Sequence, residues 1–375
     1  MKSMKAYIYL ENGVYLEAKA FGKGGSVFGE MIFNTSMTGY QEIMSDPSYA
    51  GQFIVFTMPE IGIVGVNSED MESRKIHASG AFIRKFNNKP SNFRSQKNLE
   101  QFFIEQGKFC VYDIDTRYLT KMLRDEGNLR AFVSTEISDK ESLKQALLSS
   151  SKIDEVDYVG VVSTKSVYEH KHGSWNPNTL SYSPFKPNGK KVAVIDYGVK
   201  KNILNELCEI GLEVTVYPHD TKADFLIDKF KNGEIHGVFL SNGPGEPKML
   251  KNEIEQIKKL LEAKIPMFGI CLGHQLLSNA AGFETYRLKF GQHGANHPVQ
   301  NLQTKSIEVT TQNHNYNVPE EICEICEITH RNLFDGTIEG VRYKNAPAFS
   351  VQHHPEASSG PNESKYIFKE FLELL

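Results

Sequence analysis

The second half of the chain alternates between apolar runs typical of buried strands and segments in which apolar residues recur at helical spacing. The predicted strands cover 191–198, 213–218, 237–240 and 266–270, and the helices that follow them cover 200–211, 220–233, 252–263 and 272–282. Such alternation predicts a mostly parallel central sheet flanked by helices, with sites beyond the carboxyl ends of its strands. The remaining residues add strands and end on an amphipathic helix over 365–375.

The first half has a different pattern, in which short strands are mixed with a few helices. Two apolar runs, 6–10 and 14–18, flank Asn12-Gly13, a strong signal for a hairpin turn. Asp115 is a predicted helix N-cap and Gly127 a stop signal. The other predicted elements are strands over 27–33, 52–57 and 80–86 and helices over 98–107 and 115–127. This half is predicted to be a mixed α+β domain.

A stretch rich in Gly, Pro, Ser and Asn, GSWNPNTLSYSPFKPNGK at 173–190, separates the two patterns. Such residues favour turns over regular elements. The sequence therefore predicts an N-terminal domain over 1–172, a linker over 173–190 and a second domain over 191–375, in an α/β protein overall. A length of 375 residues agrees with two or three domains.

Charge and composition argue against several classes of protein. The net charge of −4 gives no electrostatic reason to expect nucleic-acid binding. No apolar run is long enough for a membrane span, and the first residues lack the apolar core of a secretory signal. Five cysteines are an odd and sparse set that does not suggest a disulfide framework. We expect a cytoplasmic protein, and we ask whether one cysteine does chemistry.

Cys271 is the strongest candidate, because it stands in the string Gly269-Ile-Cys-Leu-Gly273 between a predicted strand and a predicted helix. Glycines on both sides allow a sharp turn that exposes the central side chain. The turn also puts the sulfur at a helix N-terminus, where partial positive charge favours the thiolate. The alternative is a buried, inert cysteine, which is common for free Cys.

Two more loops follow predicted strands. Ser241-Asn-Gly-Pro-Gly245 could offer backbone N–H groups to a developing oxyanion, or could be a plain tight turn. Gln352-His-His-Pro-Glu356 places His354 and Glu356 two apart, so that an extended segment turns them to one side as a base and its orienting acid. His353 then points away from Glu356. The alternative is an exposed polar turn. A Cys nucleophile with a later His and acid suggests acyl transfer through a thioester.

Other signals are weaker. Cys323 and Cys326 form a single CxxC without a second pair, which is little support for zinc. The chain has no HExxH, no P-loop spacing and no GxGxxG after 191–198, so the sequence predicts no metal or nucleotide cofactor in this chain.

The three loops together resemble the class I glutamine amidotransferase family, on SNGPG at 241–245, GICLGHQLL at 269–277 and HPEAS at 354–358. A closer resemblance, over nearly the whole chain, is to the branch that serves carbamoyl phosphate synthetase. It rests on FNTSMTGYQEIMSDPSYAGQ at 33–52, SNFR at 91–94, DIDTRYLT at 113–120, DYGVKKNI at 196–203, KFGQHGANHPV at 289–299, TQNHNY at 311–316 and LFDGTIEG at 333–340.

The resemblance implies that Cys271 attacks the side-chain amide of L-glutamine, that His354 transfers protons and that Glu356 orients His354. Backbone N–H groups near Gly243 and of Leu272 would stabilise the oxyanion. The implied glutamine contacts are Ser48, Gly243, Gly245, Leu272, Gln275, Asn313, Asn315 and Tyr316. Two positions depart from the family pattern, which often has Gly at 315 and Gly or an aromatic residue at 353. Asn315 tolerates the left-handed backbone region that such a Gly would use.

The resemblance also implies a partner. Ammonia would pass to a large synthetase subunit, in a heterodimer or a higher assembly, and ATP and Mg would bind only to that subunit. There bicarbonate and ATP would yield carbamoyl phosphate for arginine and pyrimidine biosynthesis. Two alternatives remain open from the sequence, a freestanding cysteine γ-glutamyl hydrolase and a non-enzymatic regulatory subunit.

Overall fold

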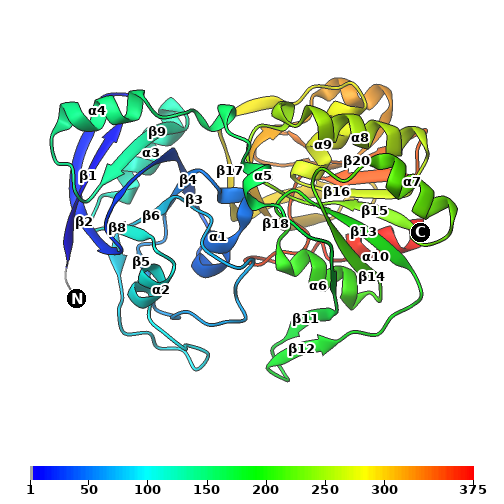
Figure 1. Cartoon of the computed structure of the whole chain (residues 1–375), viewed down its shortest axis with the longest axis horizontal. Coiled ribbons are helices and arrows are strands. Elements are labelled where there is room, and N and C mark those ends of the chain that lie inside the picture. The colour runs from blue at the N-terminus through cyan, green and yellow to red at the C-terminus, as the bar shows by residue number, and fades with distance from the viewer. Residues whose placement is uncertain (1–2) are drawn as a thin grey trace. The chain divides into compact units, whose positions relative to one another are not determined.

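In the computed structural model, which describes residues 3–375, contacts divide the chain into two units (Figure 1). Unit 1 extends to Val156 and includes Lys289–Gly294, and unit 2 contains the rest. The boundary after Val156 therefore lies before the predicted linker at 173–190. The chain also returns once to unit 1, at Lys289–Gly294. Met1 and Lys2, the start of the predicted first domain, lie outside the described residues.

Unit 1 is built on a closed barrel with the strand order β1-β2-β8-β6-β4-β3-β9. Asn12-Gly13 forms the predicted hairpin between β1 and β2, and Gly13 has the positive φ of 90° that this turn needs. Asp115 caps α3 by accepting a hydrogen bond from the Tyr118 N–H. The elements are β1 Met4–Leu10, β2 Tyr15–Gly22, β3 Ser26–Asn34, α1 Tyr40–Ser45, β4 Gln52–Phe56, β5 Glu60–Ile61, β6 Gly80–Ile83, β7 Lys85–Phe86, α2 Leu99–Glu105, β8 Phe109–Tyr112, α3 Thr116–Glu126, β9 Leu129–Ser134 and α4 Lys140–Leu148.

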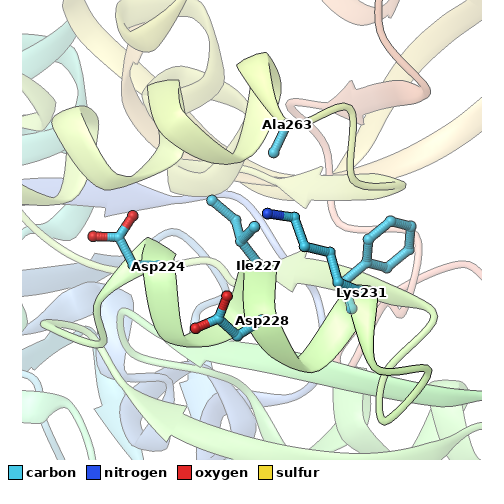
Figure 2. A pocket seen from close by; sticks show the side chains of 6 residues that line it. Asp224, Ile227, Asp228, Lys231 and Ala263 are labelled. Carbon is cyan, nitrogen blue, oxygen red and sulfur yellow. The ribbon is translucent and has the colours of Figure 1, made fainter.

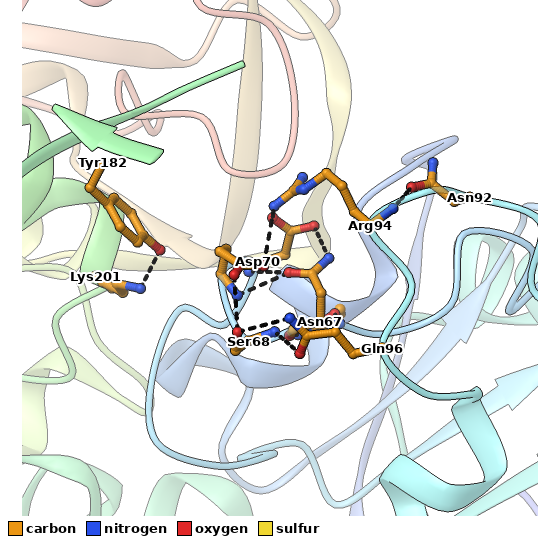
Figure 3. Close-up of polar contacts among 10 residues, drawn as sticks. Asn67, Ser68, Asp70, Asn92, Arg94, Gln96, Tyr182 and Lys201 are labelled. Atoms are coloured by element: carbon orange, nitrogen blue, oxygen red, sulfur yellow. Dashed lines mark hydrogen bonds and ion pairs between the residues drawn. The ribbon is translucent and has the colours of Figure 1, made fainter. Parts of the chain in front are cut away.

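The SNFR segment at 91–94 has a structural role within unit 1. Arg94 Nη2 lies 2.6 Å from Asp70 Oδ1, and Asn67 Nδ2 donates to Asp70 Oδ2 at 2.7 Å (Figure 3). Gln96 Oε1 accepts the Ser68 N–H at 3.0 Å. The contacts of Arg94 with Asp70 and of Gln96 with Ser68 tie the loop at 91–96 to the loop at 67–70.

Unit 2 has the expected parallel core. Its sheet has the order β10-β14-β13-β15-β16-β21-β20-β19-β17-β18, in which the pairs from β14 to β21 are parallel. The elements are α5 Tyr158–Val162, β10 Tyr168–His170, β11 His172–Asn176, β12 Ser181–Pro184, β13 Lys191–Asp196, α6 Lys201–Glu209, β14 Glu213–Pro218, α7 Ala223–Lys231, β15 Gly237–Leu240, α8 Lys251–Glu262, β16 Met267–Ile270, α9 Leu272–Ala280, β17 Tyr286–Asn301, β18 Ile307–Asn317, β19 Cys326–Asn332, β20 Ile338–Tyr343, β21 Ala348–Val351 and α10 Tyr366–Leu374.

The core of unit 2 lies on both faces of this sheet. The strands β15, β16 and β21 are buried throughout, as expected for central parallel strands covered on both sides. One core cluster joins α7, α8 and α9 to the sheet, and the other joins α6 and α10. The mixed α/β fold with a barrel-containing first unit agrees with the predicted fold class.

The predicted linker at 173–190 is partly regular. Most of it belongs to an antiparallel hairpin of β11 and β12, whose Trp175 and Tyr182 rings meet edge to face at 5.2 Å. Lys201 at the start of α6 donates to the Tyr182 hydroxyl (Figure 3). Aromatic packing and this contact hold the hairpin within unit 2, so the segment does not separate the units.

Candidate functional site

The three predicted loops follow three neighbouring strands of the unit 2 sheet. Leu240 on β15 pairs with Gly269 on β16, and Ile270 pairs with Val351 on β21, all in parallel register. Parallel strands present their carboxyl ends at one edge of a sheet. The loops that begin at 241, 271 and 352 therefore start side by side at that edge.

Cys271 forms the sharp turn between β16 and α9. Its φ of 53° is positive, which is uncommon for a residue with a side chain, and its N–H donates to Val351 O at 2.9 Å. A Cβ on Gly273 would lie 2.2 Å from Leu240 O, and one on Gly269 would lie 2.8 Å from the Gly273 backbone. Only glycine fits at both positions, which explains the glycines around the cysteine.

The Cys271 sulfur lies at the N-terminus of α9 and is almost fully buried. It is 3.5 Å from Asn313 O on β18. The N-terminal position favours a thiolate through the helix dipole.

The SNGPG loop packs directly against this turn. Ser241 O accepts the Gly273 N–H at 3.0 Å, and the Ser241 hydroxyl accepts the Tyr197 N–H at 2.9 Å. A Cβ on Gly243 would lie 2.3 Å from Tyr197 O and 2.8 Å from the Leu272 side chain. Gly243 is thus required where this loop meets Leu272, the first residue of α9.

His354 and Glu356 form a buried pair. His354 Nδ1 lies 2.6 Å from Glu356 Oε1, and the His354 N–H donates to Thr311 O at 2.9 Å. Both side chains are almost wholly buried, which excludes the exposed polar turn considered from the sequence. His354 Nε2 has no hydrogen-bond partner among the described residues, so this nitrogen is open to accept a proton.

Lys200 is a third member of this buried group. The sequence did not indicate a role for it. Its buried ammonium lies 2.9 Å from Glu356 Oε1. Burial alone would raise the pKa of Glu356, but the charge of Lys200 and the contact with His354 lower that pKa to about 2. The carboxylate is therefore ionised and can hold a proton on His354 Nδ1. No local pattern marks Lys200, because its partner is 156 residues away.

The other predicted glutamine contacts are divided between the two units. Gln275 on α9 donates through Nε2 to Tyr316 O at 2.8 Å and to Gln352 Oε1 at 3.0 Å. Asn313, Asn315 and Tyr316 lie on β18, and Ser48 lies in unit 1, on the short turn Pro47–Tyr49. Gly245 has a φ of 91°, as a glycine turn requires. The role of each in glutamine binding stays a prediction.

The remaining cysteines have different surroundings. Burial raises the pKa of Cys208 and of Cys326 to about 12 each, and that of Cys110 well above its usual value. Cys323 is exposed. Within residues 3–375 no group of three or more His, Cys, Asp or Glu side chains could hold a metal ion.

A surface pocket of about 400 Å³ lies elsewhere in unit 2, where Lys231 of α7 faces Ala263 of the turn after α8 (Figure 2). The other lining residues are Asp224, Ile227, Asp228 and Phe230. Both helices end there just before a strand begins, so the pocket lies toward the amino ends of β15 and β16. It is separate from the edge that carries Cys271.

Comparison with known proteins agrees with the two-part fold. Residues 8–133 match the family model described as carbamoyl-phosphate synthase small chain, CPSase domain, and residues 193–374 match the model for glutamine amidotransferase class-I. The carbamoyl phosphate synthase small chain of Campylobacter jejuni is 66% identical over 372 residues, or 99% of this chain and 100% of the relative.

Two further relatives bear the same name. That of Helicobacter hepaticus is 53% identical and that of Aquifex aeolicus 43% identical, each over 371 residues. The alignments cover 99% and 98% of this chain, and 98% of each relative.

The fold and the three loops thus define unit 2 as a class-I glutamine amidotransferase domain. The whole chain belongs to the carbamoyl phosphate synthase small chain family. Within residues 3–375 no helix is both long and apolar enough to span a membrane.

Proposed function

We propose that this chain hydrolyses L-glutamine and supplies the ammonia to a large carbamoyl phosphate synthase subunit. The observation that carries the proposal is the buried His354–Glu356 pair on the loop beside the Cys271 turn. An imidazole oriented by a carboxylate, next to a cysteine at a helix N-terminus, is the arrangement that thiol nucleophiles use.

In the first step, the Cys271 sulfur bonds to the side-chain carbonyl carbon of glutamine while His354 takes the thiol proton. Backbone N–H groups of Leu272 and near Gly243 stabilise the negative oxygen of the tetrahedral intermediate. The carbon–nitrogen bond then breaks. The proton on His354 passes to the leaving nitrogen, which departs as ammonia and leaves a γ-glutamyl thioester on Cys271.

In the second step, water attacks the thioester carbon while His354 takes one of its protons. The carbon–sulfur bond breaks, the thiol regains a proton and glutamate leaves. Throughout, Glu356 keeps Nδ1 of His354 protonated, because Lys200 holds the carboxylate ionised. Ser48, Gly245, Gln275, Asn313, Asn315 and Tyr316 are proposed to bind the glutamine.

The small-chain name of the relatives supports a large partner subunit, which would combine the ammonia with bicarbonate at the expense of ATP. We propose that ATP and Mg bind to that subunit only, that the complex is cytoplasmic, and that its carbamoyl phosphate feeds arginine and pyrimidine biosynthesis.

The test measures ammonia release from glutamine by the complex of this chain with its large subunit. Cys271→Ser should reduce the rate by at least about a thousandfold, since removing a nucleophile leaves only residual catalysis. Cys326→Ser is the matched control, because that thiol is buried and its pKa is raised to about 12. Undiminished release from Cys271→Ser would refute the proposal. Full activity without the large subunit would instead favour a freestanding hydrolase.

A further inference from the structure

Unit 2 contains a second buried imidazole–carboxylate pair, formed by His353 and Glu339. Both side chains are fully buried, and His353 Nδ1 lies 3.6 Å from Glu339 Oε2. That separation is longer than a hydrogen bond but within the range of an ion pair. The proposed mechanism uses neither residue, although His353 directly precedes His354.

The backbone holds Glu339 beside the segment that carries His354. Glu339 O accepts the Gln352 N–H at 2.9 Å, which extends the pairing of β20 with β21 by one step. Gln352 is also fixed by its side chain, which accepts from Gln275 at 3.0 Å. His353 therefore lies between one residue tied to α9 and another, His354, tied to Glu356.

Glu339 carries a charge that needs compensation. Burial would raise its pKa, but His353, His314 and Asn332 together lower the pKa to about 2. Asn332 Nδ2 donates to Oε1 at 3.0 Å, whereas Oε2 has no hydrogen-bond partner among the described residues. An ionised carboxylate in a protein interior requires a charged or strongly polar neighbour, and the basic side chain of His353 lies within 4 Å of it.

Further titratable groups face this pair from the surrounding elements. The His330 ring on β19 lies 5.5 Å from the His353 ring, and His330 Nε2 bonds to the Tyr366 hydroxyl on α10 at 3.0 Å. Burial lowers the pKa of His330 and of His274 on α9 to about 3 each, and that of His314 on β18 to about 4. These imidazoles, His314 included, are therefore neutral at pH 7, and none of them places a positive charge beside Glu339 at that pH.

We propose that His353 and Glu339 are positioning residues for His354. Successive side chains of an extended segment turn to opposite sides. The attraction between His353 and Glu339 holds the His353 side chain on one side of the extended segment 352–354. The backbone is then fixed, and this sets the direction in which the His354 side chain points on the other side. The inference deepens the proposed glutaminase function and rests on it.

The test is steady-state ammonia release by the complex with the large subunit, with kcat and KM for glutamine determined separately. Glu339→Gln removes the charge, keeps the shape and leaves no buried anion, so folding is retained. We expect it to lower kcat about ten- to a hundredfold, because misplacing a reacting group by an ångström has effects of that size. KM should change less than about twofold, since neither residue is among the proposed glutamine contacts. His353→Gln should also lower kcat, and because it leaves the buried Glu339 carboxylate without its basic neighbour it should lower stability as well.

The double variant Glu339→Gln/His353→Gln should be no slower than the slower single variant, because both substitutions break one interaction. Glu253→Gln is the matched control. It breaks a partly buried pair of unit 2, in which His219 Nδ1 lies 2.9 Å from Glu253 Oε1, and it should leave kcat unchanged.

Three results would overturn the inference. They are a wild-type kcat for Glu339→Gln, an effect on KM alone, or an equal loss of kcat in Glu253→Gln. If the wild-type complex released no ammonia from glutamine, the proposed function itself would fail and this inference with it.

Discussion

Lys200→Met is the most informative single perturbation of the site, because it removes one partner of a buried ion pair and leaves the other in place. The ammonium lies 2.9 Å from Glu356 Oε1, and the two side chains are 3% and 0% exposed. The side chain of Met has nearly the length of the lysine stem, so the change removes a charge more than volume.

The pKa of Glu356, which Lys200 and His354 lower together, sets the scale of the effect. A fall from the usual value of 4.5 to about 2 corresponds to roughly 3 kcal/mol of stabilisation, since a tenfold change in an equilibrium constant is about 1.4 kcal/mol. Because this folded-state pKa is lowered, the stabilisation is present above about pH 4.5 and is lost as the pH falls toward 2. Loss of one partner from a buried pair has cost about 3–5 kcal/mol in other proteins, which is of the same order.

Chemical denaturation at pH 7 should therefore show that Lys200→Met lowers the unfolding free energy by about 3 kcal/mol. The acid-side decline in stability between pH 4.5 and 2 should be shallower than in the wild type, and kcat for ammonia release should fall. Lys248→Met is the control, because it breaks a pair of similar length, 2.8 Å, whose side chains are 47% and 79% exposed. It should change stability by less than about 1 kcal/mol. Equal stability of Lys200→Met and Lys248→Met would refute the reasoning.

Three further predictions concern the scaffold. Gly273→Ala should abolish ammonia release and lower the melting temperature, because the new Cβ would lie 2.2 Å from Leu240 O; a fully active variant would show that the turn can relax. Phe268→Ala should lower the unfolding free energy of unit 2 by about 3–5 kcal/mol, as it removes a buried ring stacked on Phe349 at 4.5 Å, and a loss below 1 kcal/mol in denaturation would contradict this packing. Asp115→Ala removes the α3 cap and should lower stability by about 1 kcal/mol in the same assay, whereas Asp115→Asn should restore most of it.

Much of the fold could be predicted because local signals agree with tertiary structure. The Asn12-Gly13 hairpin, the Asp115 cap and the parallel strands of unit 2 each have a strong local pattern. The prediction of a linker at 173–190 rested on local composition alone. Turn-forming residues are also compatible with a hairpin, and here the packing of Trp175 on Tyr182 stabilises one. Closure of seven short strands into a barrel depends on long-range pairing that no local pattern encodes.

The candidate site likewise has features that a local sequence pattern predicts and contacts that no local pattern predicts. The Cys271 turn and the His354–Glu356 spacing have local causes, namely glycines at a sharp turn and alternation along an extended segment. Lys200 contacts Glu356, 156 residues later in the chain, and Glu339 contacts His353 from the neighbouring strand β20, so only the folded chain brings these side chains together.

The central claim is that Cys271 forms a covalent intermediate with glutamine. The most direct measurement is to mix the assembled complex with isotopically labelled glutamine, quench it in acid during turnover and map the labelled peptide by mass spectrometry. The proposed mechanism predicts a γ-glutamyl group on Cys271 and on none of the other four cysteines. Ammonia release with no adduct on Cys271, or with the adduct on another cysteine, would contradict it.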